Sequence, residues 1–279
     1  MRVALPDGTR IFFEVIGRKL SPEGPTMRER PTLLILHGGP GFDHSGLADV
    51  FAPLADVAQL VLLDHRGQGR SDGDDSAEWN LDHWVPDIPA LCAALELERP
   101  MILGQSFGGV VALAVAARYP DLPSKLIVSS SLAKFRPDRA FPMFERLGGP
   151  QVREVAERHF RELTAETSEE FMRVCLPVYN ATPMDPDGIA RTRLKREVGN
   201  HFLRNEGFTV DLFPELSNIR CPTLVIGGER DPITPVADSE DIAAAIPQAE
   251  LRIFEGVGHG VFRDQPEEAV AFIREFIVR

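Results

Sequence analysis

The sequence has few cysteines, no long apolar run and no cluster of basic residues. Its three cysteines form an odd, scattered set without metal-ligand spacing: Cys92, Cys175 and Cys221. Such cysteines are typical of buried thiols in a reducing compartment, so we expect a cytoplasmic protein. Since no His, Cys and Asp residues cluster with ligand spacing either, we expect a chain that needs neither a metal nor a cofactor.

The missing apolar and basic segments exclude further classes of protein. No apolar run approaches the roughly 20 residues that span a bilayer, and no apolar core of a signal peptide follows Met1. The formal net charge is −12. Nucleic-acid binding depends on neutralising phosphates, so an acidic chain without a basic patch disfavours it. We therefore expect a small-molecule substrate and neither a nucleic acid nor a membrane as partner.

Apolar, β-branched runs alternate with helical patterns, which predicts a mainly parallel sheet flanked by helices. Two antiparallel strands precede it, because Arg2–Leu5 and Arg10–Ile16 flank a Pro-Asp-Gly turn. Residues 17–31, rich in Pro, Gly and charge, predict a loop. The remaining strands are expected at Thr32–Leu36, Gln59–Leu63, Met101–Leu103, Leu126–Ser129, Thr223–Ile226 and Leu251–Phe254. Helices are expected at Leu81–Leu97, Val110–Arg118, Asp238–Ile246 and Pro266–Val278. The pattern thus predicts eight strands.

The alternation stops between residues 132 and 216. Helical periodicity continues there, as in Val152–Leu163 and Ser168–Val174, but no strand is evident. We interpret residues 132–216 as a helical cap inserted into a core made of residues 1–131 and 217–279. The cap holds eight of the 17 phenylalanines, namely Phe135, Phe141, Phe144, Phe160, Phe171, Phe202, Phe208 and Phe213.

The segment Gly104–Gly108 reads Gly-Gln-Ser-Phe-Gly and lies between a predicted strand and a predicted helix. A nucleophilic serine on a strained strand-to-helix turn has this pattern, because side chains two residues to either side would crowd the turn. The start of the helix also directs N–H groups and a positive dipole end at the site. Ser106 is therefore the predicted nucleophile.

A serine hydroxyl needs a base at neutral pH, and the base needs an acid to orient it. His259 lies between glycines in a loop that follows the last predicted strand. Asp231 lies in a turn after the preceding strand. The order Ser, Asp, His is that of α/β-hydrolases. Glu229 is the rival acid, since residues 129–134, the other loop where an acid can lie, contain no carboxylate.

The third motif is the glycine-rich loop His37–Gly41, which follows a predicted strand. Glycines let backbone N–H groups approach a developing oxyanion. We assign the oxyanion hole to the N–H groups of Gly39 and Phe107, the residue after the nucleophile. A phosphate-binding loop is excluded, because no Gly-Lys-Ser/Thr and no Gly-x-Gly-x-x-Gly is present here. His37 is expected to brace the loop.

These motifs occur together and in one order, and they include the segment Asp64–Ser71. In this respect the chain resembles the proline iminopeptidase-like branch of the α/β-hydrolase superfamily. The resemblance covers residues 1–131 and 217–279. It implies the α/β-hydrolase fold, a Ser-His-Asp triad and a structural role for Asp64–Ser71 as a turn that braces the oxyanion loop.

The elbow differs from that of proline iminopeptidases, which resemble Gly-Gly-Ser-Trp-Gly where this chain has Gln105 and Phe107. Those peptidases hold the free amine of the substrate with cap glutamates, for which Glu197 and Glu206 are the candidates here. The predicted substrate-binding residues are Gly38, Gln105, Phe135, Phe144, Glu197 and Glu206.

The leading hypothesis is hydrolysis of a small, apolar acyl ester or lactone through an acyl-enzyme. A proline iminopeptidase-type aminopeptidase is the alternative, and transfer of the acyl group to an acceptor other than water uses the same residues. A non-catalytic ligand receptor on the same fold is the hypothesis from a different class.

Overall fold

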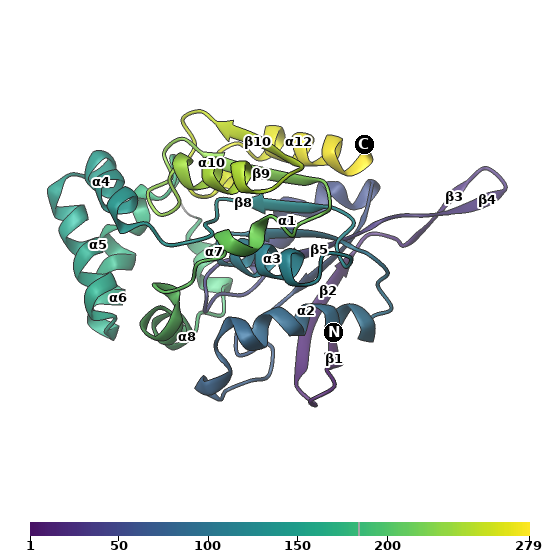
Figure 1. The fold of residues 1–279 in the computed structure, drawn as a ribbon, viewed down its shortest axis with the longest axis horizontal. Helices are drawn as coiled ribbons and strands as arrows, with labels where there is room; N and C mark the ends of the chain where they lie inside the picture. Colours follow the sequence, from purple (N-terminus) through teal and green to yellow (C-terminus); the bar gives the residue numbers. More distant parts are fainter. Residues whose placement is uncertain (184) are drawn as a thin grey trace.

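A central eight-stranded sheet organises the computed structural model, which describes residues 1–183 and 185–279 (Figure 1). The order across the sheet is β1-β2-β6-β5-β7-β8-β9-β10. Strand β2 runs antiparallel to both of its neighbours, β1 and β6, and all the other pairs run parallel. The strands are β1 (Arg2–Ala4), β2 (Arg10–Ile16), β5 (Thr32–Leu36), β6 (Gln59–Leu63), β7 (Met101–Gln105), β8 (Leu126–Ser129), β9 (Thr223–Gly228) and β10 (Ala249–Phe254). The predicted α/β-hydrolase architecture with eight mostly parallel strands is confirmed.

Helices cover both faces of the sheet because its central strands are apolar on both sides. Along β5, Leu34 and Leu36 pack on one face, whereas Leu33 and Ile35 pack on the other. The first face is covered by α2 (Leu81–Ala94), α3 (Phe107–Arg118) and α10 (Val236–Ala245). The second is covered by α1 (Ser45–Phe51), α11 (Val261–Asp264) and α12 (Pro266–Val278).

A helical segment lies between β8 and β9, and we keep the name cap for residues 132–216. Its α-helices are α4 (Pro137–Gly148), α5 (Pro150–Glu162), α6 (Ala165–Val174), α7 (Pro186–Arg191), α8 (Arg196–Phe202) and α9 (Phe213–Leu216). A π-helical turn, Leu203–Gly207, follows α8. Short 3-10 turns occur at Leu176–Val178 in the cap and at Ala52–Asp56 and Ser76–Glu78 in the core. The cap has an apolar cluster of its own, centred on Phe144 and Phe171.

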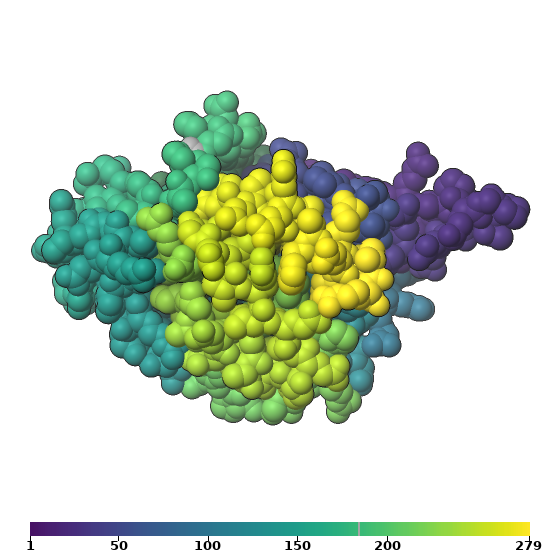
Figure 2. All heavy atoms as spheres, turned by 90° about the horizontal axis from the view of Figure 1, so that it is seen from above, coloured from purple at the N-terminus to yellow at the C-terminus, as the bar shows by residue number. Residues whose placement is uncertain are grey.

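The prediction of a loop over residues 17–31 was wrong. Within it, β3 (Leu20–Glu23) and β4 (Thr26–Glu29) form an antiparallel hairpin. Its side chains are almost all exposed, so the period-2 apolar pattern of a half-buried strand is missing from the sequence. The hairpin projects from the end of the molecule opposite the helices α4, α5 and α6 (Figures 1 and 2).

Candidate active site

Ser106 lies on the turn between β7 and α3, with φ 55° and ψ −121°. A positive φ is unusual for a residue with a side chain and has to be held by its surroundings. The backbone supplies that support, because Ser106 N donates to Ser129 O at 2.9 Å. The hydroxyl of Ser131 donates to Ser106 O at 2.7 Å. The predicted serine is thus held in a strained backbone geometry at the carboxyl end of a central strand.

The glycines on either side of Ser106 are a steric necessity. A Cβ at Gly104 would collide with the carbonyl of Gly108, and a Cβ at Gly108 would collide with the carbonyl of Leu36. These close approaches are the reason why α3 can begin directly at Phe107, three residues earlier than the apolar pattern predicts. The early start leaves the first N–H groups of α3 beside Ser106.

His259 connects Ser106 to Asp231. His259 Nε2 lies 3.0 Å from Ser106 Oγ, and His259 Nδ1 lies 2.8 Å from Asp231 Oδ2. Because a carboxylate oxygen accepts at Nδ1, that nitrogen carries the proton and Nε2 is free to accept from the serine hydroxyl. The three predicted side chains therefore come together as a hydrogen-bonded line.

The carboxylate of Asp231 is fully buried and its remaining lone pairs are satisfied locally. Its Oδ1 accepts from Ile233 N and Thr234 N, each at 2.9 Å, and its Oδ2 accepts from Thr234 Oγ1 at 2.6 Å. The turn after β9 therefore fixes the carboxylate that faces His259. The rival Glu229 is exposed and accepts from Gly256 N instead.

Two backbone N–H groups in the segments around Ser106 lack acceptors within the part of the chain that the structure describes. They belong to Gly39, in the loop after β5, and to Phe107, at the start of α3. Gly38 lies against the same turn, because a Cβ there would come 3.2 Å from Ser106 Cβ and 2.6 Å from Gln105 Oε1. Gly38, Gln105 and Phe107 thus lie around the serine, and Gly39 follows in the same loop; their roles in binding substrate or an oxyanion stay predictions.

His37 holds the peptide that carries the Gly39 N–H. His65 N donates to His37 Nε2 at 3.1 Å, so His37 Nδ1 carries the proton and donates to Gly38 O at 2.7 Å. Burial lowers the pKa of His37, which keeps this neutral tautomer. Because the C=O and N–H of a trans peptide point in opposite directions, anchoring Gly38 O directs the Gly39 N–H away from His37.

The segment Asp64–Ser71 supports the loop after β5 through side-chain hydrogen bonds. Gln68 Oε1 accepts from Gly41 N at 2.6 Å. Asp64 Oδ1 accepts from the backbone N–H of His44 at 3.0 Å and from His44 Nδ1 at 2.6 Å. Burial raises the pKa of Asp64, but the hydrogen bonds from His44 outweigh burial, and the pKa is lowered to about 2. These bonds join the loop after β5 to the core.

Glu197 and Glu206, the predicted partners of a substrate amine, have other surroundings in the structure. Glu206 Oε2 accepts from Leu81 N at 3.0 Å, at the start of α2. Burial raises the pKa of Glu206, although this backbone bond opposes the shift. The side chain of Glu197 is exposed on α8. Glu206 is therefore used as a helix cap, and Glu197 faces solvent.

The two cap phenylalanines predicted to bind substrate, Phe135 and Phe144, differ in exposure. Phe144 is fully buried and packs within the cap, 5.9 Å from the ring of Tyr179. Phe135 is half-buried and lies 5.1 Å from Phe160 and 5.6 Å from the exposed Phe208, ring to ring. Phe135 and Phe208 leave aromatic surface accessible, whereas Phe144 supports the cap from within.

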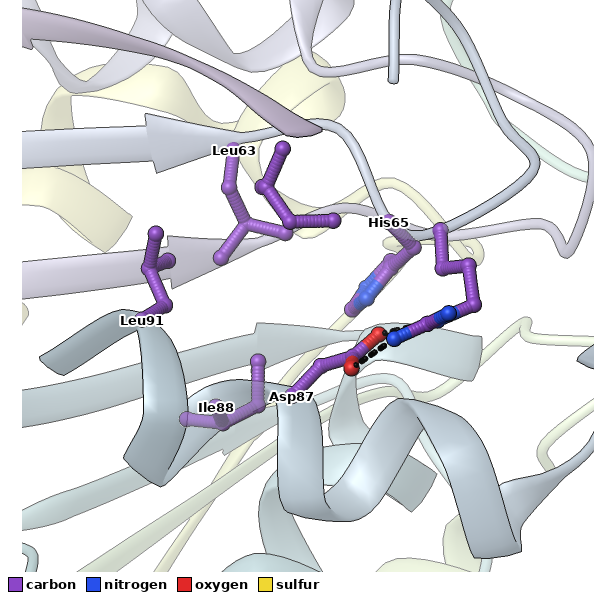
Figure 3. Close-up of a pocket in the computed structure, with 7 residues that line it drawn as sticks. Leu63, His65, Asp87, Ile88 and Leu91 are labelled. Carbon is purple, nitrogen blue, oxygen red and sulfur yellow. Dashed lines mark hydrogen bonds and ion pairs between the residues drawn. The ribbon is translucent and has the colours of Figure 1, made fainter. Parts of the chain in front are cut away.

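A small cavity lies between the end of β6 and helix α2. Figure 3 shows Leu63 and His65 on one side of it, with Asp87, Ile88 and Leu91 of α2 on the other. Its volume is about 10 Å³. This space holds no more than about one water molecule, so it is not a substrate site. Asp87 forms a bidentate pair with Arg66 at its edge, at 2.9 and 2.6 Å.

Several residues at this site have no signal in the sequence. Tyr179 of the cap accepts from His259 N at 2.7 Å and packs its ring edge-to-face on the His259 ring, with centroids 5.3 Å apart. Burial raises the pKa of Tyr179 far above its ordinary value, and the negative charge of Asp231 adds to the shift. Ser131 and Asp264 also contact the loops around Ser106.

Neither a metal site nor a membrane-spanning helix is found among the described residues, 1–183 and 185–279. No three His, Cys, Asp or Glu side chains gather there in an arrangement that could hold a metal ion. None of the helices there has both the length and the apolar character needed to cross a bilayer.

Comparison with known proteins places these features in one superfamily. Residues 31–266 match the family model described as alpha/beta hydrolase fold. A proline iminopeptidase of Lactobacillus helveticus is 28% identical over 97% of this chain and 95% of its own. The putative carbamate hydrolase RutD of Rhizobium rhizogenes is 30% identical over 84% and 88%. Among solved structures, a thermophilic esterase from Thermogutta terrifontis is 26% identical with a TM-score of 0.74, over 100% of this chain and 97% of its own.

Proposed function

Because the chain belongs to the α/β-hydrolase fold family, in its proline iminopeptidase-like branch, we propose that it is a serine hydrolase for small apolar acyl esters or lactones. The hydrogen-bonded line from Ser106 Oγ through His259 to Asp231 carries this proposal. A ligand receptor on the same fold needs neither a base on a serine nor donors for an oxyanion. These features therefore favour catalysis.

The reaction proceeds through an acyl-enzyme. Ser106 Oγ attacks the carbonyl carbon while His259 Nε2 takes its proton, and Asp231 stabilises the imidazolium that forms. The N–H groups of Gly39 and Phe107 bind the oxyanion, each worth about 3 kcal/mol in the transition state. His259 then protonates the leaving alcohol. Water, activated by the same base, releases the acid.

The chemistry of the cap favours a neutral acyl group over a substrate with a free amine. A buried ammonium group needs a carboxylate partner, and leaving a buried charge unpaired costs several kcal/mol. Glu206 is engaged at the start of α2 and Glu197 is exposed, whereas Phe135, Phe160 and Phe208 offer aromatic surface. We therefore favour ester or lactone hydrolysis.

The 28% identity to a proline iminopeptidase supports aminopeptidase activity as the second candidate. A substrate panel separates the two. It comprises p-nitrophenyl esters of increasing chain length, acyl lactones, a carbamate and an N-terminal prolyl amide, with Ser106→Ala as the control. Brisk turnover of esters or lactones without amide hydrolysis supports the proposal. Preferential hydrolysis of the prolyl amide overturns the ester assignment and keeps the nucleophile. A parent protein inert to all four classes and to a fluorophosphonate overturns the hydrolase itself.

A serine hydrolase of this kind acts in the cytoplasm under this proposal. The three cysteines are buried and form no disulfide among the residues described, as expected for a reducing compartment.

A further inference from the structure

The carboxylate of Asp264 connects the cap to the loop that carries His259. Its Oδ2 accepts from Gly258 N at 2.8 Å and from Ala181 N at 3.0 Å, and its Oδ1 accepts from Thr182 N at 2.8 Å. Gly258 directly precedes His259, whereas Ala181 and Thr182 belong to the cap. Three N–H bonds to one ionised group are charge-assisted and stronger than neutral ones, so this carboxylate joins the two segments firmly.

A second set of contacts runs parallel to these bonds. Tyr179 O accepts from His259 N at 2.7 Å, and Arg263 Nη1 donates to Asn180 Oδ1 at 3.2 Å. A Cβ at Gly258 would collide with Tyr179 O, so the backbones of the two segments lie in direct contact. The cap segment 179–182 therefore lies along the His259 loop residue by residue.

The cap end of this connection is itself fixed. The ring of Tyr179 packs 5.9 Å from Phe144 and 6.1 Å from Phe171, inside the apolar cluster of the cap. Its edge-to-face contact with the His259 ring limits how that ring can rotate. Asp231 fixes one nitrogen of the imidazole, but it does not fix the backbone from which the ring extends.

We propose that Asp264 is a positioning residue for the base, and that through it the cap segment 179–182 forms part of the catalytic apparatus. This inference depends on the proposed serine hydrolase function. Without the carboxylate, three N–H groups lose their acceptor and the two segments are joined only by the contacts of Tyr179 and Asn180, so the His259 loop is less firmly positioned while Ser106 and the oxyanion donors keep their places. Catalytic groups have to be held to about 0.5 Å, so turnover falls although the substrate still binds.

The test compares three variants on one p-nitrophenyl ester. Asp264→Ala removes every acceptor and is expected to lower kcat about 10- to 100-fold with KM within about twofold. Asp264→Asn keeps one carbonyl oxygen for Gly258 and Ala181, so it should retain activity within about fivefold of the parent. Glu267→Ala, at an exposed position of α12, is the matched control and should equal the parent.

Activity is expressed per active site titrated with a fluorophosphonate, so that loss of folded protein does not count as loss of turnover. If Asp264→Ala does not fold, Asp264→Ser, which can still accept one bond, takes its place and should fall between the alanine and asparagine variants.

Parental kcat per titrated site in the alanine or serine variant overturns the inference, as does an asparagine variant no better than alanine. A rise in KM with kcat unchanged also overturns it, because that result indicates a substrate-binding role. A parent protein whose Ser106 is not labelled indicates instead that the proposed function has failed.

Discussion

The loop after β5, which carries the proposed oxyanion donor Gly39, is held mainly by the core, whereas the loop that carries His259 is held by the cap as well as by the core. His37 and Gln68 anchor the first, and both belong to segments that directly follow β5 and β6. Tyr179 and Asp264 anchor the second, and their bonds cross from the core to residues 179–182. The cap touches the oxyanion loop as well, where Lys195 N donates to Gly41 O at 2.7 Å.

This difference separates two requirements of the reaction. Oxyanion donors act by being rigid before the substrate arrives, which a buried core provides. A base has to receive a proton and return it to a leaving group that varies with the substrate. Attaching the base loop to the cap couples its position to the element that we propose contacts that substrate. The two loops should therefore respond differently to mutation and to acid.

The largest effect should come from Ser106, where the two loops meet. Ser106→Ala removes the proposed nucleophile and should lower kcat by about 10⁶-fold. The thermal midpoint should stay close to that of the parent, since no buried polar contact other than the His259 bond is lost. Ester turnover and a thermal melt measure the two quantities. Activity within tenfold of the parent would rule out Ser106 as the nucleophile.

Removing the core anchor of the oxyanion loop should have the next largest effect. His37→Ala leaves Gly38 O and His65 N without partners and frees the peptide that carries the Gly39 donor. We expect a kcat about 10²-fold lower with little change in KM, comparable to the loss of one oxyanion donor.

His83→Ala on α2 serves as the matched histidine control. If His37→Ala keeps parental kcat, the core anchor is not needed and the contrast between the two loops fails.

The local motifs of the active site could be predicted from the sequence, but contacts between distant segments could not. The elbow, the oxyanion loop and the Asp231 turn each follow a strand and carry their signal within a few residues. Asp264 bonds to Ala181 from 83 residues away, and Glu206 bonds to Leu81 from 125 residues away. No period or spacing encodes such pairs, so Tyr179 and Asp264 were missed and Glu206 was given a different role.

The fold shows the same division. Strands buried on both faces were found to within a few residues, because burial leaves continuous apolar runs. The hairpin β3–β4 was missed because its strands bury almost nothing.

As the pH falls, the cap should lose stability through His159 before the core loses stability through Asp64. His159 of α5 is buried between Phe160 and Phe171, and burial lowers its pKa to about 4. An unfolded histidine takes up its proton near pH 6.5, so stability is full above that pH and is lost as the pH falls towards 4. The difference between the two pKa values corresponds to a loss of about 3 kcal/mol in the free energy of unfolding.

Urea unfolding at pH 7 and pH 4.5 measures this loss, with His159→Gln as the variant that cannot titrate. The parent should lose more stability than the variant between the two pH values. Equal losses would show that His159 is not responsible.

The smallest effect should come from Asp64, which anchors the core side at lower pH. Its pKa is about 2 in the folded protein against 3.8 in the unfolded chain. Because the folded pKa is depressed, the stabilisation is complete above about pH 4 and is lost as the pH falls from 3.8 to 2. It amounts to about 2 kcal/mol, and Asp64→Asn should abolish it. Urea midpoints between pH 5 and pH 2.5 measure the slope, and the exposed Asp49→Asn should keep the slope of the parent. If the difference in stability between the parent and Asp64→Asn already falls above pH 5, the expected order is wrong, because His159 in the cap should lose its stabilising effect at a higher pH than Asp64 does.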